Sequence, residues 1–362
     1  MRVPAVLTAG PELGRQARYV AVKAAYGGGT SLSAAAAAYA LLVAEAKLAR
    51  KTIGVPTTQA PKAARSYGRG RRGEQPVHLA VLGDSAAAGL GCALPEQTPG
   101  ALLAGGVARD LRRRVDLTVV ARVGARSADL EVQVAQVLTR RVDAAVIVIG
   151  ANDVTHRVPL ASSTRDLRRA VQTLRDAGAV VVVGTTPDLG SVKPLLQPLR
   201  TIAAHLSRRL AAAQTVATVE AGGTAVSLGD LLARDFYEQP QLWSDDRFHP
   251  SAEGYRRIVD ALLPAVLQSL GVDIPVSVPI SATVQDVALA ARVASHEPGV
   301  EVDPLPEQAG AGRLALLRRR LPLVGRGAPA GPTSPADLET ASEPAPAAAS
   351  GGPDAARASA PD

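Results

Sequence analysis

The sequence is poor in aromatic residues and in cysteine. Its 362 residues include six tyrosines, two phenylalanines, one tryptophan and a single cysteine, Cys92. One cysteine excludes an internal disulfide and any metal site built from several cysteines. The scarcity of aromatic rings argues against a protein that stacks bases of single-stranded nucleic acid. Cys92 itself is expected to be a small, buried packing residue.

Lysine is scarce as well, so arginine carries most of the positive charge. The formal net charge is +7, a balance that in other proteins accompanies nucleic-acid binding. Here, however, the arginines are spread along the whole chain in pairs and triplets, mostly within segments of helical pattern. Such arginines form solvated helix faces, and we therefore expect no nucleic-acid partner.

Residues 24–44 contain no charged residue and follow a basic flank. Their length suits a membrane span, and the flank favours an uncleaved signal anchor that would leave the rest of the chain outside the cytoplasm. Their Ala, Gly and Ser content, and the basic residues that follow, favour instead a helix of a cytoplasmic protein. Two hypotheses therefore remain for the N-terminal segment 1–51. Either residues 24–44 anchor the protein in a membrane, with the following domain outside the cytoplasm, or the protein is cytoplasmic.

Three further segments lie outside the regular pattern. Residues 52–75 combine proline, glycine and charge without apolar periodicity, and we expect a linker. Residues 326–362 are rich in Ala, Pro, Gly and Ser, and we expect a disordered tail. Residues 271–325 form a C-terminal extension in which "RLALLRRRLPLV" suggests a basic amphipathic helix. It would pack on the domain or lie on a membrane surface, and packing is favoured.

Between residues 76 and 270, short aliphatic runs alternate with segments of helical length. Continuous valine and isoleucine runs are typical of strands buried on both faces, and helical crossovers between them indicate a parallel sheet between helix layers. We therefore predict an α/β domain with a mostly parallel five-stranded sheet in a three-layer αβα arrangement. The predicted strands are 77–83, 116–123, 143–150, 179–186 and a weaker one within 215–228.

Ligands bind such sheets at the carboxyl ends of the strands. Ser85 follows the first run in "LGDSAAAGLGC", Gly124 follows the second in "RVGARS", and Asn152 follows the third in "GAND". Downstream, "WSDDRFHPSAEGY" contains Asp246 and His249, three residues apart and just before a predicted helix. We expect these five residues to meet at one edge of the sheet.

Together these residue types suit nucleophilic catalysis. A serine hydroxyl needs a base that takes its proton near neutral pH, and a histidine oriented by a carboxylate is such a base. His249, oriented by Asp246, would activate Ser85. The N–H groups of Ser85 and Gly124 and the side-chain amide of Asn152 would form an oxyanion hole.

The remaining polar residues near these motifs have simpler expected roles. Asp84 and Asp153 are expected to hold their loops by accepting backbone hydrogen bonds. His156 has no partner pattern and is expected to be incidental. Since no metal ligands cluster in the sequence, we expect neither a metal ion nor another cofactor.

Five of the nine aromatic residues lie between Phe236 and Tyr255. The favoured interpretation is that these rings pin the loop of Asp246 and His249 onto the domain. The alternative is that Trp243 or Tyr237 forms an apolar wall that binds the acyl or sugar part of a substrate.

The four motifs resemble those of the SGNH hydrolases, the GDSL-like lipase/esterase superfamily, in their actinobacterial type. The resemblance covers about residues 77–270, with Ala86 where the GDSL motif has leucine. It implies a flavodoxin-like fold and a cofactor-free serine hydrolase that cleaves carboxylic esters through an acyl-enzyme on Ser85. The expected partner is a small-molecule, lipid or glycan ester.

Two other functions fit the same residues. The site could transfer acyl groups to, or remove acetyl groups from, glycans or lipids of the cell envelope. The chain could also be a membrane-attached binding protein without activity, although the complete set of catalytic residue types argues against this.

Overall fold

A computed structural model of the chain describes residues 29–53, 59–229, 236–272, 281–296, 300–305 and 314–319. The expected tail 326–362 and residues 24–28 of the expected membrane span lie outside this part. The rest of that span belongs to helix α2 (Gly29–Ile53). Among the described helices, none has the length and hydropathy of a membrane-crossing segment.

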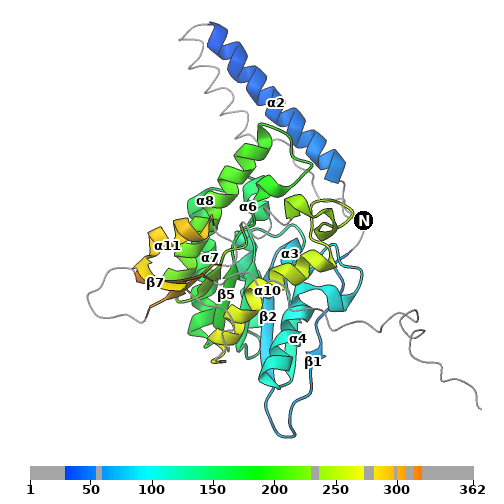
Figure 1. The fold of residues 1–362 in the computed structure, drawn as a ribbon, viewed down its shortest axis with the longest axis vertical. Coiled ribbons are helices and arrows are strands. Elements are labelled where there is room, and N and C mark those ends of the chain that lie inside the picture. Colours follow the sequence, from blue (N-terminus) through cyan, green and yellow to red (C-terminus); the bar gives the residue numbers. More distant parts are fainter. Residues whose placement is uncertain are drawn as a thin grey trace, which may run out of the picture. The chain divides into compact units, whose positions relative to one another are not determined.

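A parallel sheet forms the centre of the fold (Figure 1). Its strands lie in the spatial order β3-β2-β4-β5-β6, and every neighbouring pair among them is parallel. The strands are β2 (Val77–Gly83), β3 (Val115–Val119), β4 (Ala144–Val148), β5 (Val180–Gly184) and β6 (Thr224–Val226). Each overlaps one of the predicted aliphatic runs, which confirms the predicted α/β class.

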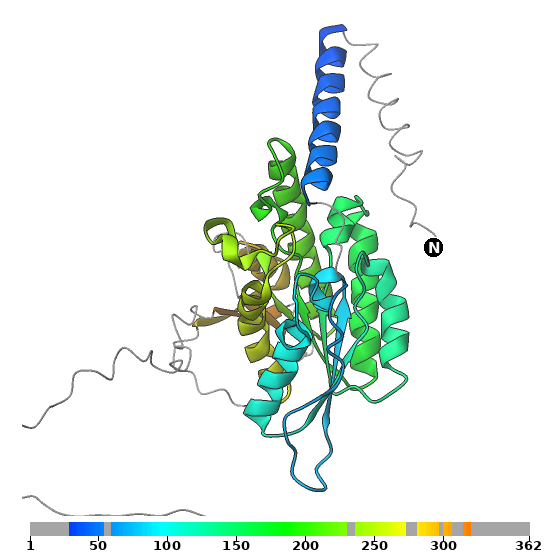
Figure 2. The same ribbon diagram turned by 90° about the vertical axis from the view of Figure 1, so that its right-hand side faces the viewer.

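Helices cover both faces of this sheet (Figure 2). In β2, Leu79 and Val81 pack in one core with α4 (Pro99–Leu111) and α10 (Ala252–Ser269). The alternate residues Ala80 and Leu82 pack on the opposite side with α5 (Leu130–Val137) and α7 (Leu160–Asp176). Because successive side chains of a strand point to opposite faces, a strand buried on both must be apolar throughout.

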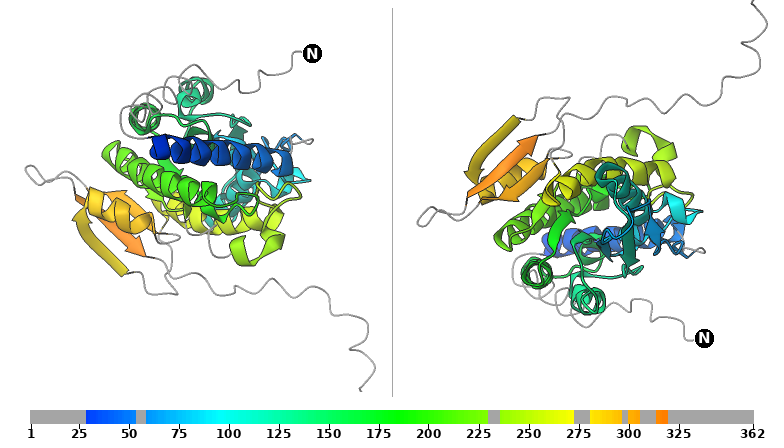
Figure 3. Two further views of the ribbon diagram at one scale, coloured as in Figure 1. Left: turned by 90° about the horizontal axis from the view of Figure 1, so that it is seen from above. Right: turned by 90° about the horizontal axis from the view of Figure 1, so that it is seen from below.

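The sheet is larger than the predicted five strands, because it continues beyond β6. In the part of the chain that the structure describes, it has nine strands in the order β1-β3-β2-β4-β5-β6-β8-β9-β7. Beyond β6 lie β8 (Glu301–Pro304), β9 (Leu314–Arg319) and β7 (Ser281–Asp286), all paired antiparallel, with α11 (Val287–Ala294) packed on them (Figure 3). Within "RLALLRRRLPLV", the expectation of a helix is therefore wrong for the described residues Leu314–Arg319. Ala315 and Leu317 are buried and Leu314 is exposed, an alternation that suits a strand.

The other edge is also longer than expected. Within the expected linker 52–75, β1 (Ser66–Tyr67) pairs antiparallel with β3. Ala63 is buried in the same core as β2, and the Tyr67 hydroxyl donates to its carbonyl. Part of the expected linker therefore belongs to the folded domain.

The helices that connect the strands bring residues distant in sequence to the carboxyl ends of β2, β3 and β4. Short helices start there: α3 (Ser85–Ala88) after β2 and α6 (Ala151–Thr155) after β4. Helix α8 (Leu199–Glu220) packs against α7 and follows the loop after β5.

Candidate active site

Ser85 lies where β2 turns into α3. The last strand residue, Gly83, has a φ of 133°, and a Cβ atom there would lie 1.9 Å from the carbonyl oxygen of Val148 in β4. Only glycine therefore fits at this strand end. Asp84 caps α3 by accepting the N–H of Ala86 (3.0 Å), so that Ser85 is the first residue of the helix and is nearly buried.

The structure brings Ser85, His249 and Asp246 into one chain of hydrogen bonds. His249 Nδ1 lies 2.6 Å from Asp246 Oδ2, and His249 Nε2 lies 2.9 Å from Ser85 Oγ. Because the carboxylate accepts the Nδ1 proton, Nε2 is left to accept the proton of the serine hydroxyl. This is the geometry required of a nucleophile and its base.

The carboxylate of Asp246 is held by more than the histidine ring. Its Oδ1 accepts the backbone N–H groups of Phe248 (2.9 Å) and His249 (2.8 Å) and the hydroxyl of Ser244 (2.8 Å). Burial acts to raise the pKa of Asp246, but the hydrogen bonds from His249 and Phe248 outweigh it and hold this pKa well below its usual range. Asp246 is therefore ionised throughout the neutral range and stabilises an imidazolium at His249.

Aromatic rings hold the loop that carries these two residues. The indole N–H of Trp243 donates to the carbonyl of Phe236 (2.7 Å), and the two rings meet edge to face at 4.9 Å. The ring of Phe248 meets that of His249 in the same way, also at 4.9 Å. Trp243 thus fastens the loop through the contacts expected in the favoured interpretation, whereas Tyr237 is half exposed and lines a separate pocket.

Besides Ser85, the expected oxyanion-hole residues are Gly124 and Asn152, and their segments are bound to each other. Gly124 lies in the exposed loop after β3, with a φ of 82°. Asn152 in α6 donates one side-chain N–H to the carbonyl of Ala125 (3.0 Å), and Asp153 accepts the N–H of Ser127. Asn152 keeps a second N–H, and within the described residues no hydrogen bond engages the N–H of Gly124.

The loop of Gly124 is also bound to the strand end that carries Ser85. The N–H of Arg122 donates to the carbonyl of Gly83 (3.1 Å). Hydrogen bonds therefore connect the segments of all three expected oxyanion donors.

Two buried glutamines support these strand ends, and neither was among the residues predicted from the sequence. Gln133 accepts the N–H of Gly83 (2.7 Å) and donates to its carbonyl (2.9 Å). Gln214 donates to the carbonyl of Ile149 (2.9 Å) and accepts the N–H of Thr186 (2.7 Å). The available signal was a polar residue on an otherwise apolar helix face, since Gln133 lies beside Leu130, Val134 and Val137.

Other residues near the motifs behave largely as expected. Asp84 and Asp153 accept backbone hydrogen bonds from the following helix and from the neighbouring loop.

Cys92 is buried and its sulfur lies 3.3 Å from the carbonyl of Gln97, and burial raises the pKa of its thiol to about 12. It is therefore a packing residue rather than a nucleophile. His156 is exposed and contacts the carbonyl of Asn152 (2.8 Å).

A serine, a histidine and an aspartate hydrogen-bonded in sequence at the carboxyl end of a parallel sheet define the class of serine hydrolases. Residues 81–257 match the GDSL-like Lipase/Acylhydrolase family. The chain is 44% identical over 249 residues to the GDSL-like esterase Rv1075c of Mycobacterium tuberculosis, a match that covers 65% of this chain and 79% of that protein. The chain therefore belongs to the GDSL-like lipase/acylhydrolase family and is an ester-hydrolysing enzyme.

Solved structures give more distant matches. An acetylxylan esterase, Axe2, from Geobacillus stearothermophilus is 18% identical with a TM-score of 0.40, over 54% of this chain and 95% of that chain. The psychrotrophic esterase EstA from a Pseudoalteromonas species is 16% identical with a TM-score of 0.39, over 54% of this chain and 98% of that chain.

Proposed function

We propose that this enzyme hydrolyses carboxylic esters through a covalent acyl intermediate on Ser85. The observation that carries the proposal is the hydrogen-bond chain from Asp246 through His249 to the Ser85 hydroxyl, with distances of 2.6 and 2.9 Å. It supplies a nucleophile, a base in reach of its proton, and a carboxylate that fixes the tautomer of the base.

In the first half of the reaction, Ser85 Oγ attacks the ester carbonyl while its proton passes to His249 Nε2. The carbonyl oxygen becomes an oxyanion, which the N–H groups of Ser85 and Gly124 and the free amide N–H of Asn152 stabilise. When the carbon–oxygen bond of the alcohol breaks, the imidazolium gives its proton to the departing oxygen. The acyl group remains on Ser85.

In the second half, His249 takes a proton from water, and the resulting hydroxide attacks the acyl-enzyme. The second oxyanion collapses as Ser85 recovers its proton from the imidazolium, and the carboxylic acid leaves. Asp246 stays ionised in both halves, because its hydrogen bonds lower its pKa, so that it stabilises each imidazolium in turn.

Labelling with a fluorophosphonate probe tests this mechanism before any substrate is known, because the probe reacts with activated serines. We expect the wild type to be labelled on one residue, Ser85→Ala to be unlabelled and His249→Ala to react at least about 100-fold more slowly. The matched control is Ser269→Ala at the end of α10, which should be labelled like the wild type. A folded wild type that resists the probe would contradict the proposal and favour a binding protein without activity.

Asn152→Ala tests the oxyanion hole. We expect kcat for p-nitrophenyl acetate to fall by about 10²–10³, with a small change in KM, because the lost donor acts on the developing oxyanion rather than on the bound ester. The same fall appearing in KM would instead assign Asn152 to substrate binding.

A further inference from the structure

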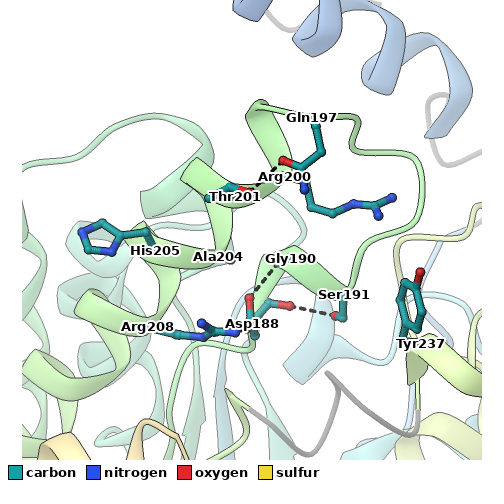
Figure 4. Close-up of a pocket in the computed structure, with 10 residues that line it drawn as sticks. All are labelled: Asp188, Gly190, Ser191, Gln197, Arg200, Thr201, Ala204, His205, Arg208 and Tyr237. Atoms are coloured by element: carbon teal, nitrogen blue, oxygen red, sulfur yellow. Dashed lines mark hydrogen bonds and ion pairs between the residues drawn. The ribbon is translucent and has the colours of Figure 1, made fainter.

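A pocket of about 420 Å³ lies beside the loop that follows β5. Its walls come from η3 (Leu189–Ser191), from the first turns of α8 and from Tyr237 (Figure 4). Gln197 and Thr201 contribute polar groups and Tyr237 an aromatic ring. None of these residues takes part in the proposed hydrolysis.

Among the described residues that line this pocket, Asp188 is the one carboxylate, and it is already neutralised. Asp188 is buried, and its Oδ2 lies 2.6 Å from Nη2 of Arg208. Its Oδ1 accepts the N–H of Gly190 (2.7 Å). The Asp188–Arg208 pair therefore contributes no net charge to the pocket.

Arg200 is left as an uncompensated positive charge in the pocket. Its Nε donates to the carbonyl of Leu195 (2.8 Å) and its Nη2 to the carbonyl of Lys193 (2.9 Å), which together hold the guanidinium in place. Among the described residues, no carboxylate pairs with it. Figure 4 shows its side chain extending over the side of the pocket where Tyr237 lies. A fixed guanidinium is suited to bind carboxylate or phosphate oxygens.

A second cation lies at the same side. The ammonium of Lys193 is 5.5 Å from the centroid of the Tyr237 ring, a cation–π distance, and within the described part of the chain it too pairs with no carboxylate. Tyr237 is 52% exposed, so that its ring is accessible to a ligand. The pocket therefore combines positive charge, an aromatic ring and polar groups.

An apolar cluster connects this pocket to the catalytic loop. Leu189 and Val192, in and just after η3, pack in a cluster that also contains Trp243 and Phe248. Phe248 in turn packs against the ring of His249. One small apolar cluster thus contacts both the loop that forms part of the pocket wall and the ring of the catalytic histidine.

We infer that this pocket is an anion-binding subsite, which holds a carboxylate or phosphate group of the ester substrate at Arg200. The enzyme's substrates are then esters that carry a negative charge at a distance from the reacting carbonyl. The assignment as a substrate subsite rests on the proposed function, whereas anion binding at Arg200 does not.

Binding is tested with Ser85→Ala, which keeps the pocket and cannot turn over. Inorganic phosphate and acetate are titrated at constant ionic strength, and the fluorescence of Trp243, the chain's one tryptophan, is followed. We expect saturable binding that Arg200→Gln weakens at least about tenfold and Arg200→Lys weakens less. The matched control, Arg209→Gln, changes an exposed arginine of the same helix outside the pocket and should bind like the parent. The absence of saturable binding, or equal binding by Arg200→Gln, would overturn the inference.

Catalysis then tests the link to the substrate. The p-nitrophenyl monoesters of glutaric and suberic acid are compared with neutral p-nitrophenyl esters of matching length. We expect Arg200→Gln to lower the ratio of kcat/KM for charged over neutral esters by about tenfold for at least one length. An unchanged ratio at both lengths would overturn the subsite assignment. If the wild type hydrolysed none of the esters, the proposed function would fail while anion binding at Arg200 would stand.

Discussion

The strand ends that carry Ser85 and Asn152 are built alike. Strand β2 ends at Gly83, and Gly150 follows the end of β4; both glycines have a φ of 133°. A fully buried glutamine from a helix supports each one, Gln133 in the first case and Gln214 in the second. Both glutamines accept a buried backbone N–H where a strand ends, that of Gly83 in the first case and that of Thr186 in the second.

The two glutamines nevertheless act differently. Gln133 binds the N–H and the carbonyl of the same residue, Gly83, as a neighbouring strand would. Gln214 bridges two segments, since it binds the carbonyl of Ile149 at the end of β4 and the N–H of Thr186 after β5. Gln133 thus positions Ser85 by holding the end of one strand, β2. Gln214 positions Asn152 by fixing the distance between the ends of two strands, β4 and β5.

The largest expected difference comes from the glycines. A Cβ at Gly83 would lie 1.9 Å from a backbone oxygen, that of Val148, whereas at Gly150 it would lie 1.9 Å from a side-chain oxygen, that of Thr186. We expect Gly83→Ala to lose about 4 kcal/mol or more of unfolding free energy and Gly150→Ala about 1–3 kcal/mol. Urea unfolding measures both. Equal losses would show that the two strand ends do not differ in this way.

Replacing the glutamines should have a smaller effect. Gln133→Leu leaves two buried backbone groups of Gly83 without this partner, and we expect a loss of about 2–3 kcal/mol of unfolding free energy. The same change should displace Ser85, which follows Gly83 by two residues, and should therefore slow its labelling by the fluorophosphonate probe. Gln214→Leu should lower kcat for p-nitrophenyl acetate and slow labelling less than Gln133→Leu does, because it loosens the strand end next to Asn152 and leaves Ser85 in place. Equal labelling rates in the two variants would contradict the distinction.

The sequence was sufficient to predict the strand ends but not the groups that support them. The aliphatic runs and the residues after them, such as Ser85 and Asn152, follow one another along the chain and are visible in a short window. The partner of Gln133 is Gly83, 50 residues away, and local pattern carries no information about such a pairing. A polar residue among the buried positions of a helix was visible, whereas the group it binds was not.

The antiparallel strands at the sheet edge were missed for a related reason. "LALLRR" at 314–319 has the leucines and arginines of an amphipathic helix, and its local preference is helical. Its pairing with β8 and β7 outweighs this preference, because it completes the edge beyond β6. Prediction of the sheet therefore stopped at the weak fifth run. The partner of β6 is β8, a strand of four residues, and the next strand, β9, comes from the segment that resembles a helix.

The last comparison is between the two buried aspartates beside these strand ends, and its effect is seen only as a change with pH. Asp153 accepts the N–H of Ser127 with both oxygens, whereas Asp84 uses only Oδ1, and its buried Oδ2 has no partner among the described residues. Burial raises the pKa of Asp84 to about 6. A folded-state pKa above the unfolded value means that the folded protein holds the proton more tightly. Stability from this group is therefore full below about pH 4 and declines as the pH rises to about 6.

Asp84→Asn should remove this decline, which is on the order of 2–3 kcal/mol for a shift of about two pKa units. The measurement is the unfolding free energy between pH 4 and 7.5 for the wild type, Asp84→Asn and Asp153→Asn, and the slope should flatten most in Asp84→Asn. Asp246 does not interfere, because its lowered pKa gives stability that is lost only as the pH falls below about 4. If the unfolding free energy of Asp84→Asn still declined with pH as in the wild type, Asp84 would not be the cause of the decline. Oδ2 of Asp84 would then have a partner in solution, and the two aspartates would be held equally well.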